Sequence, residues 1–116
     1  MIHNFNDDIS TPEKFVVTLE LVPGREILGG AMETIKKISK EAYDDGRITA
    51  VSITDNPGGN PALSPDAIGR EILDYGMDVI VHFTGRDANR MGMESRALQL
   101  ARMGLPALLV VVADNQ

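Results

Sequence analysis

The sequence predicts an α/β fold in which helices connect the strands of a parallel sheet. The first observation is that four short apolar and β-branched segments recur along the 116 residues, at positions 15–19, 48–53, 79–83 and 108–112. The second is that stretches of helical period separate these segments. The third is that each helical stretch ends at a glycine, and the glycines Gly46, Gly76 and Gly104 are 30 and then 28 residues apart (46 to 76, 76 to 104). Strands joined by helices pair in parallel through right-handed crossovers, so four buried parallel strands alternating with three helices are expected.

The first predicted strand leads into a helix that the spacing of apolar residues places across positions 28–42. The residues of its apolar stripe are three and four positions apart: Leu28, Ala31, Ile35, Ile38 and Ala42. The opposite face is charged: Glu33, Lys36, Lys37, Lys40 and Glu41. We therefore expect the stripe to pack on the sheet.

The second helix is expected to begin at Ser64-Pro65-Asp66, after strand 48–53. The Ser64 side chain can accept a hydrogen bond from a free N–H group of the first turn, and Pro65 suits the first helical position because its φ is preset. The residues expected to face inward are Ile68, Ile72 and Tyr75.

The third helix, after strand 79–83, has a less regular pattern. Asp87 is its expected N-cap, and Gly92 interrupts the apolar stripe. That stripe consists of Met91, Ala97, Leu98, Ala101 and Met103. We expect residues 1–116 to form a single domain in which residues 1–12 are loosely held.

Composition narrows the possible functions. Lys and Arg number 11 and Asp and Glu number 17, which gives a formal charge of −6. An acidic chain without clustered Lys or Arg is not expected to bind nucleic acid or a membrane surface. Its longest apolar run, residues 107–113, is far shorter than the roughly 20 residues that cross a bilayer. The acidic N-terminus is unlike a secretory signal, so a cytoplasmic location is expected. The absence of cysteine excludes thiol catalysis and thiolate metal sites.

Polar side chains follow each predicted strand at its carboxyl end. They are Glu20, Thr54 with Asp55, His82 with Thr84, and Asp114. Because ligands bind at the carboxyl edge of parallel sheets, these residues are the candidate site. Strand ends also meet solvent in proteins that bind nothing there, and that interpretation stays open.

Two of these residues suggest specific roles. Glu20 lies between two leucines of a strand, and a carboxylate that loses solvation there is suited to act as a general acid; the alternative is an exposed position on a wet face. His82 can bond a ligand or serve a structural role. No metal site is predicted, because the other histidine, His3, lies in the stretch expected to be loose.

Four segments, in this order and spacing, resemble the methylenetetrahydrofolate reductase family. They are Val17-Thr18-Leu19-Glu20-Leu21-Val22-Pro23, Val51-Ser52-Ile53-Thr54-Asp55, Val81-His82-Phe83-Thr84 and residues 108–114. Known members are (βα)8 barrels that contain FAD. The resemblance therefore implies a partial (βα)8 TIM barrel with its first four strands and three helices. It also implies reduction of 5,10-methylenetetrahydrofolate to 5-methyltetrahydrofolate, with FAD as cofactor and NADH or NADPH as electron donor.

The same resemblance implies roles for the strand-end residues. Glu20 corresponds to the general acid that helps to open the imidazolidine ring of the folate substrate. Thr54 and His82 correspond to flavin-contacting residues. Asp114 corresponds to an aspartate that lies against the flavin and steadies the cationic iminium form of the substrate. Asp55 and Thr84, which stand in the same motifs, are expected to bind the cofactor too.

The chain also departs from the family pattern. Ala113 precedes Asp114 where family members usually have glycine, and strands five to eight are missing. We therefore expect a fragment lacking its C-terminal half, or a homo-oligomer or partner subunit that covers the free strand edges. The alternative function is a non-catalytic half-barrel that assembles with itself or a partner. A third hypothesis is a phosphate- or nucleotide-binding module that uses residues 56–60 and Arg86.

Overall fold

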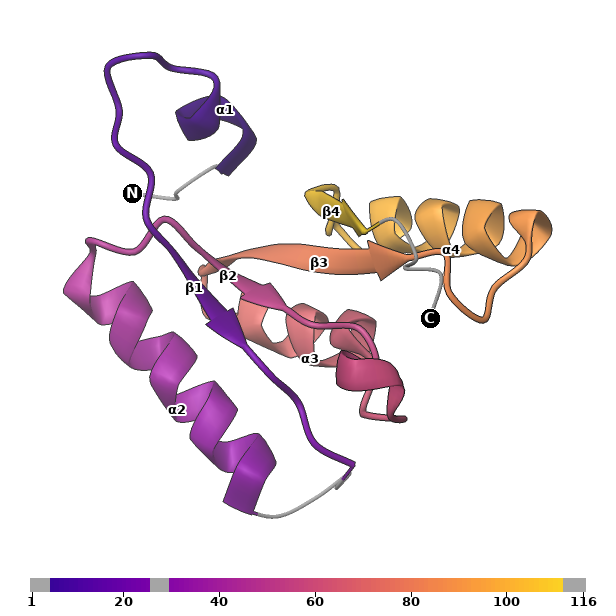
Figure 1. Cartoon of the computed structure of the whole chain (residues 1–116). Helices are drawn as coiled ribbons and strands as arrows, with labels where there is room; N and C mark the ends of the chain where they lie inside the picture. Colours follow the sequence, from indigo (N-terminus) through magenta and orange to yellow (C-terminus); the bar gives the residue numbers. More distant parts are fainter. Residues whose placement is uncertain (1–4, 26–29, 112–116) are drawn as a thin grey trace.

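The computed structural model describes residues 5–25 and 30–111, which form an α/β fold around one four-stranded sheet (Figure 1). The elements in chain order are α1 (Phe5–Ile9), β1 (Thr18–Leu21), α2 (Gly30–Asp45), β2 (Ala50–Ile53), the 3-10 turn η1 (Pro57–Gly59), α3 (Pro65–Leu73), β3 (Asp78–Thr84), α4 (Arg90–Arg102) and β4 (Leu108–Val111). The strands lie side by side in the order β1-β2-β3-β4, and every pair is parallel. The predicted alternation of parallel strands and helices is confirmed.

One face of the sheet carries the main core. Alternate strand residues, such as Val51 and Val79, which are register partners, point to this face and are fully buried. Ile35 of α2, Ile68 of α3 and Leu100 of α4 belong to the same cluster. Helices α2, α3 and α4 therefore cover the same face of the sheet.

On the opposite face, the described residues form a second, smaller cluster near the amino ends of the strands. Phe5 of α1 packs there against a small cluster of Ala50, Ile80 and Ala107. The Phe5 backbone N–H also donates to Asp78 Oδ2 at 2.6 Å. Within the stretch 1–12 that we expected to be loose, the described part thus contains a short helix that contacts the sheet.

The predicted helix boundaries around α3 are confirmed. The Ser64 hydroxyl accepts a hydrogen bond from the Asp66 N–H at 3.2 Å, and Pro65 occupies the first turn. The three helix-ending glycines all have positive φ: +82° at Gly46, +100° at Gly76 and +81° at Gly104. These angles explain the glycine repeat, because residues with a Cβ rarely adopt this conformation.

The buried face of α2 differs from the predicted stripe. Met32, Ile35, Ser39 and Ala42 are buried, whereas Ala31 and Ile38 are exposed, and Leu28 lies outside the described residues. Ser39 can occupy the core because its hydroxyl donates to the Ile35 carbonyl at 2.8 Å. A pattern that counts only apolar residues assigns Ser39 to the wrong face.

The prediction for α4 is wrong at its start and on much of its face. The N-cap is Asn89, whose side chain accepts from the Gly92 N–H at 2.8 Å, and not Asp87. Met91 and Leu98 are 77 % and 74 % exposed, and Ala101 is also exposed. The side turned to the core carries Leu100, with Met93, Ala97 and Met103 partly buried. A polar residue, Arg96, shares this inner side, and apolar spacing gives no sign of it.

The prediction of four buried strands holds for β2 and β3 only. β1 starts at Thr18, three positions later than predicted, and Phe15 is 91 % exposed. Three consecutive residues of β4 are exposed: Leu109, Val110 and Val111. Both strands are edges of the sheet in the described part of the chain, so each has one neighbour and less cover.

Candidate functional site

A cleft of about 370 Å³ opens at the carboxyl ends of the strands. Five of the six predicted site residues line it: Glu20, Thr54, Asp55, His82 and Thr84. The sixth, Asp114, lies outside the described residues. The loop 56–59, Arg86, Asp87 and Val111 complete the lining. Parallel pairing brings these residues together because it sets every carboxyl end at the same edge of the sheet.

His82 lies near the end of β3, on the face of the sheet that the three large helices leave free. Its residue is 8 % exposed, and its Nε2 atom is buried without a hydrogen-bond partner among the described residues. Glu20 Oε1 lies 3.8 Å from His82 Nε2, which is too long for a hydrogen bond. A buried polar atom without a partner needs an explanation, and a bound ligand or water is one.

Glu20 faces the same cleft but is not in the desolvated position that we expected. Its side chain is 59 % exposed. Leu19 and Leu21 pack into the main core, so the intervening Glu20 points to the open face. Because β1 is an edge strand, little of the described structure shields this carboxylate from water.

Thr54 follows β2 and is tied to β1, since its backbone N–H donates to the Leu21 carbonyl at 3.2 Å. Its hydroxyl Oγ1 is buried and has no partner within the described ranges. Leaving a buried hydroxyl unpaired costs about 1–3 kcal/mol. Thr54 and His82, which line one cleft, thus each carry a buried polar atom without a partner in the described structure.

Asp55 and Thr84 are held by internal bonds. Asp55 Oδ2 accepts from Arg96 Nη1 at 2.7 Å and from the Thr84 backbone N–H at 3.5 Å. Thr84 Oγ1 accepts from the Arg86 backbone N–H at 3.2 Å. The Asp55 side chain is largely buried, and its Oδ2 atom is already bonded within the protein.

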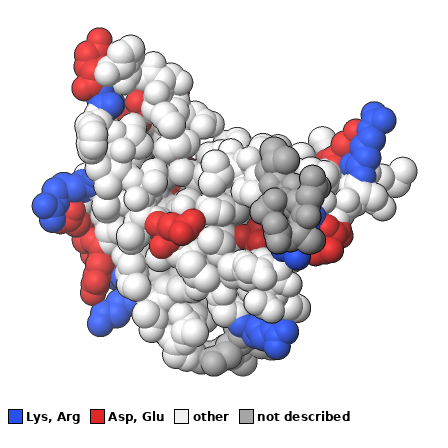
Figure 2. Space-filling view, viewed as in Figure 1, with Lys and Arg blue, Asp and Glu red and all other residues white. Residues whose placement is uncertain are grey.

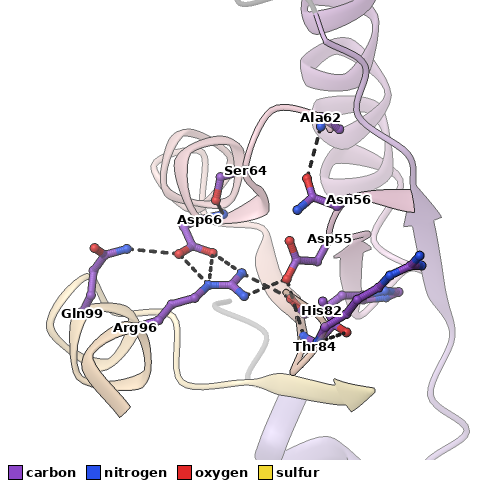
Figure 3. Close-up of polar contacts among 10 residues, drawn as sticks. Asp55, Asn56, Ala62, Ser64, Asp66, His82, Thr84, Arg96 and Gln99 are labelled. Atoms are coloured by element: carbon purple, nitrogen blue, oxygen red, sulfur yellow. Dashed lines mark hydrogen bonds and ion pairs between the residues drawn. The ribbon is translucent and has the colours of Figure 1, made fainter. Parts of the chain in front are cut away.

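Behind the cleft lies a polar network that the sequence analysis missed (Figure 3). Arg96 of α4 donates two hydrogen bonds to Asp66 of α3: one from Nη2 to Oδ1 at 2.6 Å and one from Nε to Oδ2 at 3.0 Å. Gln99, one turn along α4, also donates to Asp66 at 3.0 Å. Arg96 Nη2 further donates to the backbone carbonyl of His82 at 3.3 Å. The only sequence signal is the i, i+3 spacing of Arg96 and Gln99 on one helix face.

The electrostatics of this network favour a permanently charged guanidinium. The hydrogen bonds that Arg96 donates to Asp66 raise the pKa of Arg96, and Asp55 adds to this effect, whereas desolvation opposes it. The guanidinium carbon also lies 5.0 Å from the centre of the Phe83 ring. Two carboxylates thus share one arginine, and the side chains of all three are mostly buried.

The loop after β2 is shaped by positive φ angles at Asn56, Gly58 and Gly59. Asn56 Oδ1 accepts from the Ala62 N–H at 3.2 Å and closes the loop. The Arg86 guanidinium lies over Gly59, and a Cβ on that glycine would be 2.8 Å from its nitrogens. The loop and the chain after β3 are therefore packed together at the rim of the cleft.

Three further observations concern metal ligands, membrane-spanning helices and surface charge. Within residues 5–25 and 30–111, no group of three His, Cys, Asp or Glu side chains is placed to hold a metal ion. In the same ranges, every helix is too short or too polar to span a membrane. On the face shown in Figure 2, the described Lys and Arg side chains stand apart from one another near the margins.

No protein-family model matches the sequence, and no curated protein matches it.

Proposed function

We propose that this chain is a flavin-dependent reductase, or part of one, that converts 5,10-methylenetetrahydrofolate to 5-methyltetrahydrofolate. The proposed fold is a partial (βα)8 TIM barrel, and the proposed site is the cleft at the strand ends. The observation that carries the proposal is the gathering of Glu20, Thr54 and His82 in one cleft. These are the residues to which the resemblance to methylenetetrahydrofolate reductases assigns an acid and two flavin contacts.

The residues present fit a flavin. Thr54 Oγ1 and His82 Nε2 are buried polar atoms that lack partners in the described structure. The ring system of a flavin carries N–H and C=O groups along one edge, which could pair with both atoms. A volume of about 370 Å³ also lies within the range of about 300–1,000 Å³ that is typical of ligand pockets.

In this proposal each side chain has a defined task. Thr54 and His82 hold and orient the ring system of the cofactor. Bound FAD would supply the redox chemistry, accepting a hydride from reduced nicotinamide and delivering it to the methylene carbon of the folate. Glu20 donates a proton to a nitrogen of the imidazolidine ring, so that the ring opens. The distance of 3.8 Å between Glu20 Oε1 and His82 Nε2 supports this role, because His82 is a proposed cofactor contact. Asp114 is proposed to steady the cationic iminium form of the substrate.

The experiment is size-exclusion chromatography of the purified protein with added FAD, with absorbance followed in the visible range. The proposal predicts that the bands of oxidised flavin elute with the protein. Addition of NADH or NADPH under anaerobic conditions should bleach them, and methylenetetrahydrofolate should restore them. A colourless protein peak that retains no FAD would count against the proposal.

The second candidate is a non-catalytic half-barrel that assembles with a second copy or a partner. It is favoured by the exposed apolar residues Leu109, Val110 and Val111 on β4, a strand that pairs only with β3 in the described part. The same column separates the two candidates. An assembled species without flavin favours the half-barrel, and flavin in the protein peak favours the reductase. Binding of phosphate without flavin would instead favour an anion-binding module at loop 56–60 and Arg86.

A further inference from the structure

We propose that Arg96 is a positioning residue that holds the carboxyl ends of β2 and β3 in the arrangement needed to bind the ligand of the cleft. The identity of that ligand, FAD, rests on the proposed function above. The positioning role itself rests on the contacts of Arg96, and it can be measured without any ligand.

Arg96 contacts both strand ends that carry the unsatisfied polar atoms. Its Nη1 binds Asp55, the residue directly after Thr54, at 2.7 Å. Its Nη2 binds the backbone carbonyl of His82 at 3.3 Å. A shift of Arg96 would therefore be transmitted to Thr54 through one bonded neighbour and to His82 through its own peptide group.

Arg96 is itself fixed on the side away from the cleft. Asp66, at the start of α3, accepts hydrogen bonds from two nitrogens of Arg96, and Gln99 donates to the same carboxylate. The Asp66 side chain is only 9 % exposed. The Phe83 ring lies beneath the guanidinium at 5.0 Å. These contacts leave the guanidinium little freedom, and Figure 3 shows it lying between Asp66 and Asp55.

The geometry requires arginine in particular. One planar group reaches Asp66, Asp55 and the His82 carbonyl at the same time, using nitrogens that point in three directions. A lysine would keep the charge, but its single ammonium cannot reproduce this planar fork. The charge alone can stabilise the two carboxylates, whereas the fork is needed to fix the positions of the strand ends.

The test compares Arg96→Lys with Arg90→Lys. Arg90 lies on the same helix, but it is exposed and pairs only with Glu94 in the described structure, at 3.0 Å. Each variant is first checked by circular dichroism and thermal unfolding. The dissociation constant for FAD and the NMR relaxation dispersion of the His82 imidazole are then measured. The chain has two histidines, so a His3→Gln variant assigns the signals.

We expect Arg96→Lys to fold with a secondary structure like that of the unsubstituted protein, while its FAD affinity falls about tenfold or more, because small misplacements of binding groups are costly. We also expect millisecond exchange to appear at His82 without ligand. Arg90→Lys should change neither quantity. Arg96→Lys with unchanged FAD affinity and unchanged His82 relaxation would overturn the proposal.

Two further outcomes are distinguishable. If the unsubstituted protein does not bind FAD, the proposed function fails, and the His82 relaxation measurement still decides the role of Arg96. If Arg96→Lys does not fold, Asp55→Ala replaces it, since this change removes the carboxylate that Arg96 Nη1 contacts and leaves Asp66 in place. Exchange at His82 in that variant supports the proposal, and its absence overturns it.

Discussion

The His82 side chain is buried, and its Nε2 atom has no hydrogen-bond partner among the described residues. The Glu20 side chain is exposed and lies 3.8 Å from that nitrogen. The two side chains therefore have different tasks in the proposed reaction. A buried, fixed imidazole is suited to hold a cofactor, whereas a carboxylate in contact with water can exchange its proton after each turnover. Thr54 resembles His82 in this respect, because its hydroxyl is also buried and unpaired in the described structure.

Glu20→Gln separates these tasks. Glutamine keeps the size of the side chain but cannot donate the proton, so we expect FAD binding and flavin reduction by nicotinamide to survive while folate reduction is abolished. The matched control is Glu41→Gln on the exposed face of α2, which should leave all three activities intact. Stopped-flow absorbance measures both half-reactions. Folate turnover by Glu20→Gln would show that another group is the acid.

Gly59→Ala tests the left-handed backbone conformation of the loop after β2. Gly59 has a φ of +76°, and an added Cβ would lie 2.8 Å from the Arg86 nitrogens. We expect a loss of about 1–2 kcal/mol in the free energy of unfolding from the backbone conformation, measured by urea denaturation. Gly24→Ala is the control, because a Cβ added at Gly24 would meet nothing within 4 Å. Equal stability of the two variants would contradict the described loop geometry.

Among the helices, α3 and α4 begin with side-chain caps. Ser64 accepts from the Asp66 N–H, and Asn89 accepts from the Gly92 N–H. The cap of α3 also fixes Asp66, the main partner of Arg96. Helix capping is therefore coupled to the network behind the cleft.

Ser64→Ala removes the cap of α3. We expect it to lower the free energy of unfolding by about 1 kcal/mol, the usual cost of losing such a cap. Ser95→Ala, at an exposed position inside α4, should be neutral or slightly stabilising because alanine is the better helix former. Chemical denaturation of the two variants gives the comparison. A Ser64→Ala variant as stable as Ser95→Ala would argue against the cap.

The whole sheet has two free edges in the described part of the chain, β1 and β4. Exposed, apolar strand edges favour pairing with another chain. Val110 on β4 is 66 % exposed. The half-barrel candidate depends on contact at this edge, so the edge can be tested separately from the cleft.

Val110→Lys should weaken any self-association of the chain, because a charge on an edge strand disfavours pairing. Met91→Lys, at an exposed position on helix α4, is the control and should have no such effect. Sedimentation velocity over a range of concentrations measures the change. Equal association of both variants would exclude β4 as the contact.

Much of the fold followed from local signals in the sequence. The β-branched segments predicted where the strands occur along the chain, Ser64 predicted a helix start, and Gly46, Gly76 and Gly104 predicted helix ends. These features depend on backbone conformation near each residue, which the side chain itself controls. The collection of Glu20, Thr54 and His82 at one edge also followed, because parallel strand order determines it.

Only the tertiary structure decided which side chains are buried and which polar groups meet. Ser39 replaced Ile38 in the core because its hydroxyl finds a backbone partner within its own helix. Glu20 is exposed because β1 is an edge strand in the described part of the chain, and the residues next to Glu20 in the sequence do not determine this. Arg96 and Asp66 are 30 residues apart and met only when α3 and α4 packed on the same face. Burial and long-range pairing depend on which residues of other helices and strands pack against a side chain. The sequence around a residue does not contain that information.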